Sequence, residues 1–191
     1  MVNRFLVAVV MVCAMLGSSH AVAGEQTVVR MTTNMGVIEM TLDGERAPKT
    51  VANFVRYAKE GFYNGTVFHR VIAKFMIQGG GFSKDMRKKS THAAVLNEAD
   101  NGLRNSTGSI AMARTSSPDS ATSQFFINTH DNGFLNHRGE TASEWGYAVF
   151  GRVTKGMDVV LRIEAVETGS RSGMKDVPRK PVVIESMVVL E

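Results

Sequence analysis

The chain has 191 residues, among them 22 Lys and Arg, 18 Asp and Glu and a single cysteine. Its formal net charge of +4 is too small to indicate a nucleic-acid-binding protein, and one cysteine excludes an internal disulfide framework. No spacing of His, Cys or acidic residues is typical of a metal site, so we expect neither a metal nor another cofactor.

The N-terminal segment has the organisation of a secretory signal peptide. Arg4 supplies a positive flank, residues 5–17 form an almost unbroken apolar run, and Ala21-Val22-Ala23 offers a cleavage site. An uncleaved membrane anchor is the alternative, but a membrane-spanning helix needs about 20 apolar residues. We therefore expect removal of residues 1–23, leaving residues 24–191 as one domain in a bacterial periplasm without membrane attachment.

Two β-rich runs follow, residues 27–33 and 37–42, separated by the turn-forming Asn34-Met35-Gly36. Within the second run, alternate residues are apolar, which predicts a half-buried antiparallel strand. The last run, residues 182–190, returns to strand character. It is expected to pair with the N-terminal strands and to protect the edge of the sheet.

Two segments have helical spacing. Pro48 opens the first, which ends at Gly61 and places apolar residues at i, i+3, i+4 and i+7: Val51, Phe54, Val55 and Ala58. The second is a short helix after Gly156, indicated by Met157, Val160 and Leu161. The patterns together predict a β-rich domain with two helices.

The segment 67–82 places one guanidinium among apolar side chains. In a strand, Phe68, Arg70 and Ile72 share one face. After a turn at Ala73-Lys74, a second strand is expected to return alongside with Phe75, Met76 and Gln78. An ordinary surface arginine beside core residues is the alternative interpretation.

Three sequence blocks carry a family resemblance. They are Phe68-His69-Arg70-Val71-Ile72 with Phe75-Met76 and Gln78-Gly79-Gly80; Gly-Ser-Ile-Ala-Met-Ala at 108–113 with Ser-Gln-Phe-Phe-Ile at 123–127; and Val-Phe-Gly-Arg-Val-Thr-Lys-Gly-Met-Asp at 149–158. In this order they resemble the cyclophilin family of peptidyl-prolyl isomerases over roughly residues 28–191. The resemblance implies a mainly β fold, a closed eight-stranded antiparallel β-barrel with a packed interior, capped by two α-helices. It also implies that the substrate binds on an outer face.

The same resemblance assigns roles within the site. Arg70 is the catalytic residue, and an apolar floor for proline comes from Phe75, Met76, Phe126 and Leu135. Gln78 and Gln124 hydrogen-bond the substrate backbone or orient the arginine, and Ala113 offers a backbone edge to the peptide. His69 is expected to be structural, because on a strand it points away from the face of Arg70.

Three further substrate-binding positions depart from the family pattern. Arg114 stands where eukaryotic relatives often have Asn, and Tyr147 stands where many have His, as in bacterial members. Phe134 aligns with the Trp of cyclosporin-sensitive members. Because Phe lacks the indole N–H donor, we expect weak inhibition by cyclosporin.

The expected function is isomerisation of X-Pro bonds in unfolded or partly folded exported polypeptides, by a monomer that binds no nucleic acid. A module that only holds proline-containing segments, as a chaperone or scaffold, is the main alternative. A barrel that binds ligands in its interior, as lipocalins do, lacks support from the motifs. So does a hydrolase triad, because no nucleophile elbow surrounds Ser116 near His130 and Asp131. The basic cluster of Lys84, Arg87, Lys88 and Lys89 is either a solvated loop or a contact for acidic surfaces.

Overall fold

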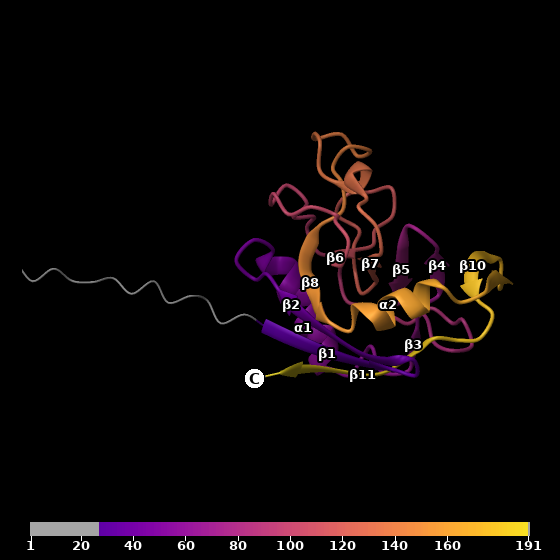
Figure 1. Ribbon diagram of the computed structural model, residues 1–191. Coiled ribbons are helices and arrows are strands. Elements are labelled where there is room, and N and C mark those ends of the chain that lie inside the picture. Colours follow the sequence, from indigo (N-terminus) through magenta and orange to yellow (C-terminus); the bar gives the residue numbers. More distant parts are fainter. Residues whose placement is uncertain (1–26, 191) are drawn as a thin grey trace, which may run out of the picture.

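Strands provide most of the regular structure (Figure 1). The computed structural model describes residues 27–190, and the predicted signal peptide lies outside this range. The elements in chain order are β1 (Thr27–Thr33), β2 (Gly36–Leu42), α1 (Pro48–Lys59), β3 (Thr66–Val67), β4 (Arg70–Ile72), β5 (Met76–Gly79), β6 (Ser109–Met112), β7 (Phe125–Asn128), the 3-10 helix η1 (Gly133–Leu135), β8 (Val149–Lys155), α2 (Met157–Glu164), β9 (Thr168–Arg171), β10 (Met174–Pro178) and β11 (Val183–Leu190).

The N-terminal hairpin and its pairing with the last strand are confirmed. β1 and β2 run antiparallel, with Thr33 opposite Gly36 across the predicted turn. On its other side β1 pairs antiparallel with β11, where Met31 lies opposite Met187. Figure 1 shows β11 lying alongside β1 at one side of the molecule.

One antiparallel sheet of nine strands organises the domain, in the order β3-β11-β1-β2-β8-β6-β7-β5-β4. The prediction of a mainly β fold with two helices is confirmed, but a closed eight-stranded barrel is not. The sheet has nine strands in all, and two of them, β3 and β4, lie at its ends. A separate two-stranded hairpin, β9 with β10, lies beside β4 (Figure 1).

A break at Phe68-His69 explains the extra strand. The N–H of Phe68 donates to Val182 O on the β11 side, whereas the N–H of His69 donates to Gln78 O in β5, each at 3.0 Å. The pairing partner therefore changes between these two residues, and one predicted strand becomes β3 and β4. The prediction that Phe68 shares a face with Arg70 and Ile72 is wrong for the same reason: Phe68 is fully buried in the main core, but Ile72 packs on the opposite face.

Both helices form where the sequence predicts them. Helix α1 has Pro48 in its first turn and no capping side chain of its own. Instead, the Glu98 carboxylate accepts from the N–H groups of Lys49 and Thr50, at 3.1 and 2.8 Å, and supplies the negative charge that a helix N-terminus favours. Helix α2 follows Gly156, which has a φ of +82° and lies so close to Val37 O that a Cβ would collide with it, so only glycine fits there.

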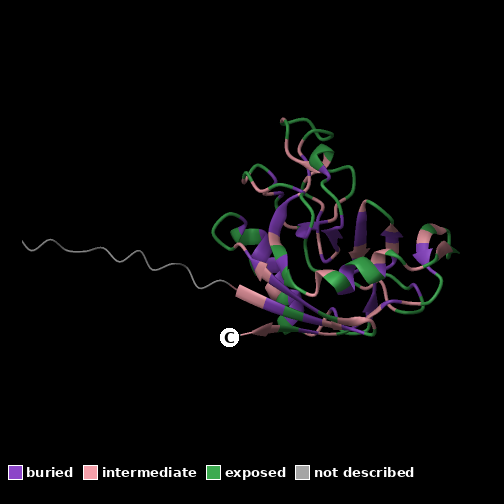
Figure 2. Ribbon diagram, in the orientation of Figure 1, coloured by how far each residue is buried: buried purple, intermediate pink, exposed green. Residues whose placement is uncertain are grey.

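Alternation along the central strands divides the apolar residues between two faces. Ile77, Ile110 and Ile127 belong to the main core, into which both helices pack. Their neighbours Met76, Ala111 and Phe126 form a second buried cluster with Val149. Because adjacent strand residues point to opposite faces, this second cluster lies on the outer side of the sheet. Figure 2 shows the buried strands together with the largely exposed connections that surround them.

No helix within residues 27–190 combines the length and the apolar character needed to cross a bilayer.

Candidate functional site

Arg70 lies directly opposite Gln78 in the β4–β5 ladder. The Nη1 of Arg70 donates to Gln78 Oε1 at 3.4 Å, and Gln78 Nε2 donates to Gln124 Oε1 at 3.0 Å. The Arg70 side chain remains 42% exposed. The structure therefore brings together three predicted site residues as a polar row with the guanidinium at its open end.

Glycine at position 81 makes room for this row. A Cβ at Gly81 would lie 2.5 Å from the Cγ of Gln124. Any side chain there would displace Gln124 from its bond to Gln78.

The predicted proline floor is a single apolar cluster. It is built on the outer-face residues Met76 and Phe126, and the other predicted residues that pack against it are Phe75, Ala113, Leu135 and Tyr147. Phe126 meets Tyr147 edge to face, with ring centroids 5.7 Å apart. The apolar residues that the sequence places far apart thus form one surface beside the polar row, since Gln78 pairs with Phe126 in the β5–β7 ladder.

Phe134 lies at the rim of this cluster rather than within it. Its ring stacks on Phe75, with centroids 5.7 Å apart and planes 23° apart, yet 62% of the residue is exposed. Phe75 itself belongs to the turn before β5, not to the strand as predicted. Lys74 in this turn has a φ of +59°, and its N–H donates to Glu164 Oε1 at 2.7 Å. Helix α2 therefore holds the turn that carries Phe75.

A group of hydrogen-bonded asparagines lies beside the outer-face apolar cluster: Asn105, Asn128, Asn132 and Asn136. Asn132 Nδ2 donates to Asn128 Oδ1 at 2.7 Å, and Asn128 Nδ2 donates to Asn105 Oδ1 at 3.1 Å. The backbone N–H of Asn105 donates to Asn136 Oδ1 at 2.8 Å. Asn105, Asn128 and Asn132 are buried, so these mutual bonds satisfy polar groups that water does not reach.

The same asparagines hold the backbone of three residues that pack against the outer-face cluster. Asn132 Nδ2 donates to Phe75 O at 2.8 Å. Asn105 Nδ2 lies 3.3 Å from Leu135 O and 3.4 Å from Tyr147 O. Sequence reasoning missed this group, because the only signal was an Asn-rich connection around residues 101–108 that indicated a loop.

Arg114 and Ala113 use backbone contacts within the protein. Arg114 Nε donates to Gly146 O at 2.8 Å and Nη2 to Ala142 O at 3.1 Å. Its guanidinium lies 4.7 Å from the ring centroid of Tyr147, a cation–π contact. The N–H of Ala113 donates to Gln124 O at 2.9 Å. Arg114 thus fastens the connection before β8 and covers one side of Tyr147.

Asp176 is a neighbour of Arg70 that sequence reasoning did not find. It lies in β10 with a φ of +60°, and its Oδ2 is 4.0 Å from Arg70 Nε. Both side chains are partly exposed, so this ion pair contributes little to stability. The contact shows that the β9–β10 hairpin lies next to the guanidinium.

His69 is buried beneath the site, in agreement with a structural role. Its ring lies 4.6 Å from that of Phe82, and its Nδ1 has no hydrogen-bond partner among the described residues. Burial lowers the pKa of His69 from 6.5 to about 4, and the nearby charge of Arg70 acts in the same direction. The imidazole is therefore neutral at pH 7.

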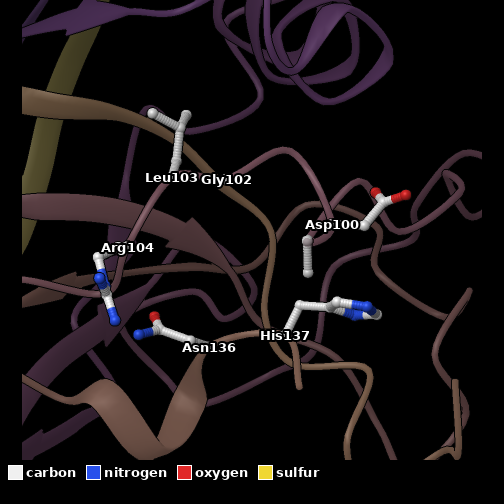
Figure 3. Close-up of a pocket in the computed structure, with 7 residues that line it drawn as sticks. Asp100, Gly102, Leu103, Arg104, Asn136 and His137 are labelled. Atoms are coloured by element: carbon white, nitrogen blue, oxygen red, sulfur yellow. The ribbon is translucent and has the colours of Figure 1, made fainter. Parts of the chain in front are cut away.

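A cavity of about 230 Å³ lies between residues 99–104 and Asn136-His137 (Figure 3). Its walls include Asp100, Arg104 and His137, but none of the predicted site residues. Leu103 both lines this cavity and packs against the outer-face cluster. The cavity is thus a neighbour of the predicted proline floor and not the floor itself. Within residues 27–190, no group of three or more His, Cys, Asp or Glu is arranged to hold a metal ion.

Comparisons of the sequence give one consistent family. The family model described as "Cyclophilin type peptidyl-prolyl cis-trans isomerase/CLD" matches residues 28–189. The peptidyl-prolyl cis-trans isomerase cyp18 of Streptomyces antibioticus is 59% identical and covers 85% of this chain and 98% of its own. Isomerase A of Dickeya dadantii is 54% identical over the full length of both chains, and isomerase B of Escherichia coli is 56% identical over 83% of this chain and 97% of its own.

Solved structures agree with the sequence comparisons. A cyclophilin-type isomerase of Cryptosporidium parvum superposes with a TM-score of 0.71 and 26% identity, covering 87% of this chain and 99% of that one. A second crystal structure of that protein, in the presence of the dipeptide Ala-Pro, gives a TM-score of 0.69 at 26% identity, with 86% and 99% covered. On the family match, the relatives and the fold, the chain belongs to the cyclophilin-type peptidyl-prolyl cis-trans isomerases.

Proposed function

We propose that this protein is an exported isomerase that interconverts cis and trans X-Pro bonds in folding polypeptides, and that Arg70 stabilises the twisted amide without forming a covalent bond. The observation that carries the proposal is the position of Arg70 and Gln78 beside the outer-face apolar cluster. A polar row next to an apolar surface matches a substrate whose polar amide adjoins an apolar pyrrolidine ring.

The chemistry requires no nucleophile. Rotation about a peptide bond has a barrier of about 18–20 kcal/mol because the twisted state loses amide resonance. In that state the lone pair of the prolyl nitrogen is no longer delocalised, so a nearby cation interacts with it more strongly than with the planar amide. A guanidinium is always charged, and its planar fork offers several donors in fixed directions.

The apolar cluster supplies the other half of the proposed site. Phe75, Met76, Phe126 and Leu135 would hold the pyrrolidine ring, while the asparagine group fixes the carbonyls of Phe75 and Leu135. Such fixed geometry limits the motion of the floor during rotation of the bond. The Cryptosporidium structure in the presence of Ala-Pro supports a proline-containing ligand for this fold.

Export is proposed from the N-terminal sequence. The charged flank, the apolar run and Ala21-Val22-Ala23 precede the family match, which begins at residue 28. In the periplasm, the enzyme would accelerate proline isomerisation, which takes about 10–100 s without catalysis at 25 °C.

The test is an NMR exchange measurement on a short peptide with a central Ala-Pro bond. Catalytic amounts of the protein are expected to raise the cis-trans exchange rate in proportion to enzyme concentration. Binding of the peptide without faster exchange would contradict the proposal and leave a binding module as the function.

A further inference from the structure

Two basic segments meet on one side of the proposed site. Residues 82–89 contain Lys84, Arg87, Lys88 and Lys89. Residues 168–180, which include the β9–β10 hairpin, contain Arg171, Lys175, Arg179 and Lys180. We call these eight positions the basic surface.

A small apolar cluster holds the two segments together. Met86 from the first and Val177 from the second are both buried against Val67 of β3. Phe82 and Met174 pack against the same cluster. The two segments are far apart in the sequence, so they come together only in the folded protein.

Charge is concentrated on this surface. The two segments hold eight of the 22 Lys and Arg residues but only two of the 18 Asp and Glu residues, Asp85 and Asp176. The rest of the chain therefore has more acidic than basic residues. The modest net charge of the protein is therefore the sum of a strongly positive region and a slightly negative remainder.

Several of these cations have no charged partner in the described structure. Arg87 pairs with Asp85, and Lys89 lies over the ring of Phe62, with its Nζ 4.3 Å from the centroid. Within residues 27–190, no carboxylate forms an ion pair with Lys84, Lys88, Arg171, Lys175, Arg179 or Lys180, all of which are exposed. Like charges that gather without partners repel each other, and an acidic ligand relieves that repulsion.

The basic surface adjoins the proposed catalytic row at both ends. Asp176, between Lys175 and the buried Val177, lies 4.0 Å from Arg70. At the other end, a Cβ at Gly81 would collide with Gln124, and the Gly81 carbonyl accepts from the N–H of Lys89 at 3.0 Å. A peptide that reaches Arg70 and Gln124 therefore arrives at the edge of both basic segments.

We propose that the basic surface binds acidic residues of the same polypeptide whose proline occupies the site, so that the enzyme acts preferentially on X-Pro bonds near acidic segments. This inference rests on the proposed function and specifies its substrate class. An extended chain advances about 3.3 Å per residue, so acidic side chains a few positions from the proline reach beyond the row. Charge complementarity of this kind raises association rates and fixes orientation.

The experiment compares peptides that contain one central Ala-Pro bond. Four Glu residues lie either before or after this bond, and matched peptides have four Gln residues at the same positions. Exchange rates are measured by NMR and affinities by fluorescence anisotropy, at about 20 mM and about 300 mM salt. We expect roughly tenfold tighter binding and faster exchange for one Glu-flanked peptide at low salt, most of which is lost at high salt as screening increases.

A double charge reversal, Lys88→Glu with Lys175→Glu, should abolish the preference and leave the Gln-flanked peptide within about twofold. The matched control, Lys49→Glu with Lys59→Glu, changes the net charge equally on the exposed face of α1 and should retain the preference. Circular dichroism checks that each variant is folded. If the control variant lost the preference for Glu-flanked peptides to the same extent, net charge would explain that preference. This outcome would overturn the proposed role of the basic surface.

Equal affinities of the wild-type protein for Glu- and Gln-flanked peptides at low salt would also overturn it. Tighter binding of Glu-flanked peptides without faster exchange on any peptide would instead contradict the proposed isomerase function and support the basic surface. Duplex DNA that displaces the Glu-flanked peptide at equal phosphate and carboxylate concentration would assign the surface to nucleic acid and refute the inference.

Discussion

Arg70 and Gln78 face each other across one antiparallel pair, with the guanidinium 3.4 Å from the amide oxygen. This contact orients the cation without neutralising it. The first prediction concerns its removal. Because Arg70 is proposed to act on the twisted amide, Arg70→Ala should lower turnover much more than peptide affinity. A loss of about 2–4 kcal/mol corresponds to a roughly 30- to 1,000-fold slower reaction.

Arg70→Lys is the matched control for charge, and it should recover little activity because an ammonium cannot reproduce the fork. NMR exchange and peptide titration measure the two quantities. A folded Arg70→Ala protein that retains full activity would refute the mechanism and the alignment behind the other site assignments.

Phe134 should limit inhibition by cyclosporin. It is stacked on Phe75 and largely exposed, so it offers an aromatic wall but no donor. Phe134→Trp should tighten inhibition by one hydrogen bond, about 0.5–1.5 kcal/mol, or roughly two- to tenfold. Inhibition constants for the two proteins provide the measurement, with turnover of an Ala-Pro peptide as the control. Identical constants would show that the missing indole is not the cause.

Asn132 should stabilise the fold and the proline floor together. Asn132→Ala removes a donor to Phe75 O, which keeps the N–H of Thr129, and it leaves the buried Asn128 Oδ1 unsatisfied. We expect the free energy of unfolding in urea to fall by about 1–3 kcal/mol. Among the folded molecules, the KM for an Ala-Pro peptide should rise. Unchanged stability would mean that water replaces the asparagine amide.

His69 should make the stability of the fold depend on pH. Its pKa is lowered from 6.5 to about 4, mainly by burial, so the unfolded chain binds a proton that the folded protein does not. The contribution is complete above about pH 6.5 and decreases as the pH falls to about 4, by up to about 3 kcal/mol. Urea unfolding of the wild-type protein and His69→Gln between pH 4 and pH 7 gives the difference. Parallel stability curves would contradict the assigned pKa.

The mature exported protein should begin at Gly24. This expectation rests on Ala21-Val22-Ala23 and the apolar run before it. Intact mass and N-terminal sequencing of protein from the producing cell check it. A membrane-bound species that retains residues 1–23 would favour an anchor instead.

Local sequence patterns predicted several elements of the fold, including the strand that brings Gln78 alongside Arg70. The pairing with Gln78, the β1–β2 hairpin and both helices depend on local spacing and turn residues, which are visible in one stretch of chain. Alternation could not predict the break at Phe68-His69, because it arises from competition between two distant partners, Val182 and Gln78.

Other features of the site depend on which loops meet. Asp176 reaches Arg70 only because the β9–β10 hairpin packs beside β4. The bonds from Asn105 to Leu135 and Tyr147 likewise connect three separate segments. Loop residues show no periodicity that indicates their contacts, so these assignments required the tertiary structure.

In the proposed function, the outer-face location of the apolar cluster determines which substrates can reach it. A binding site inside a barrel would admit a chain only by its end or by opening of the sheet. A cluster on the outer face of the sheet, such as that around Met76 and Phe126, can be approached from the side. A long polypeptide can therefore bind there at any internal proline and dissociate by the same route. It can then bind again at its next proline, and its end never has to pass through the protein.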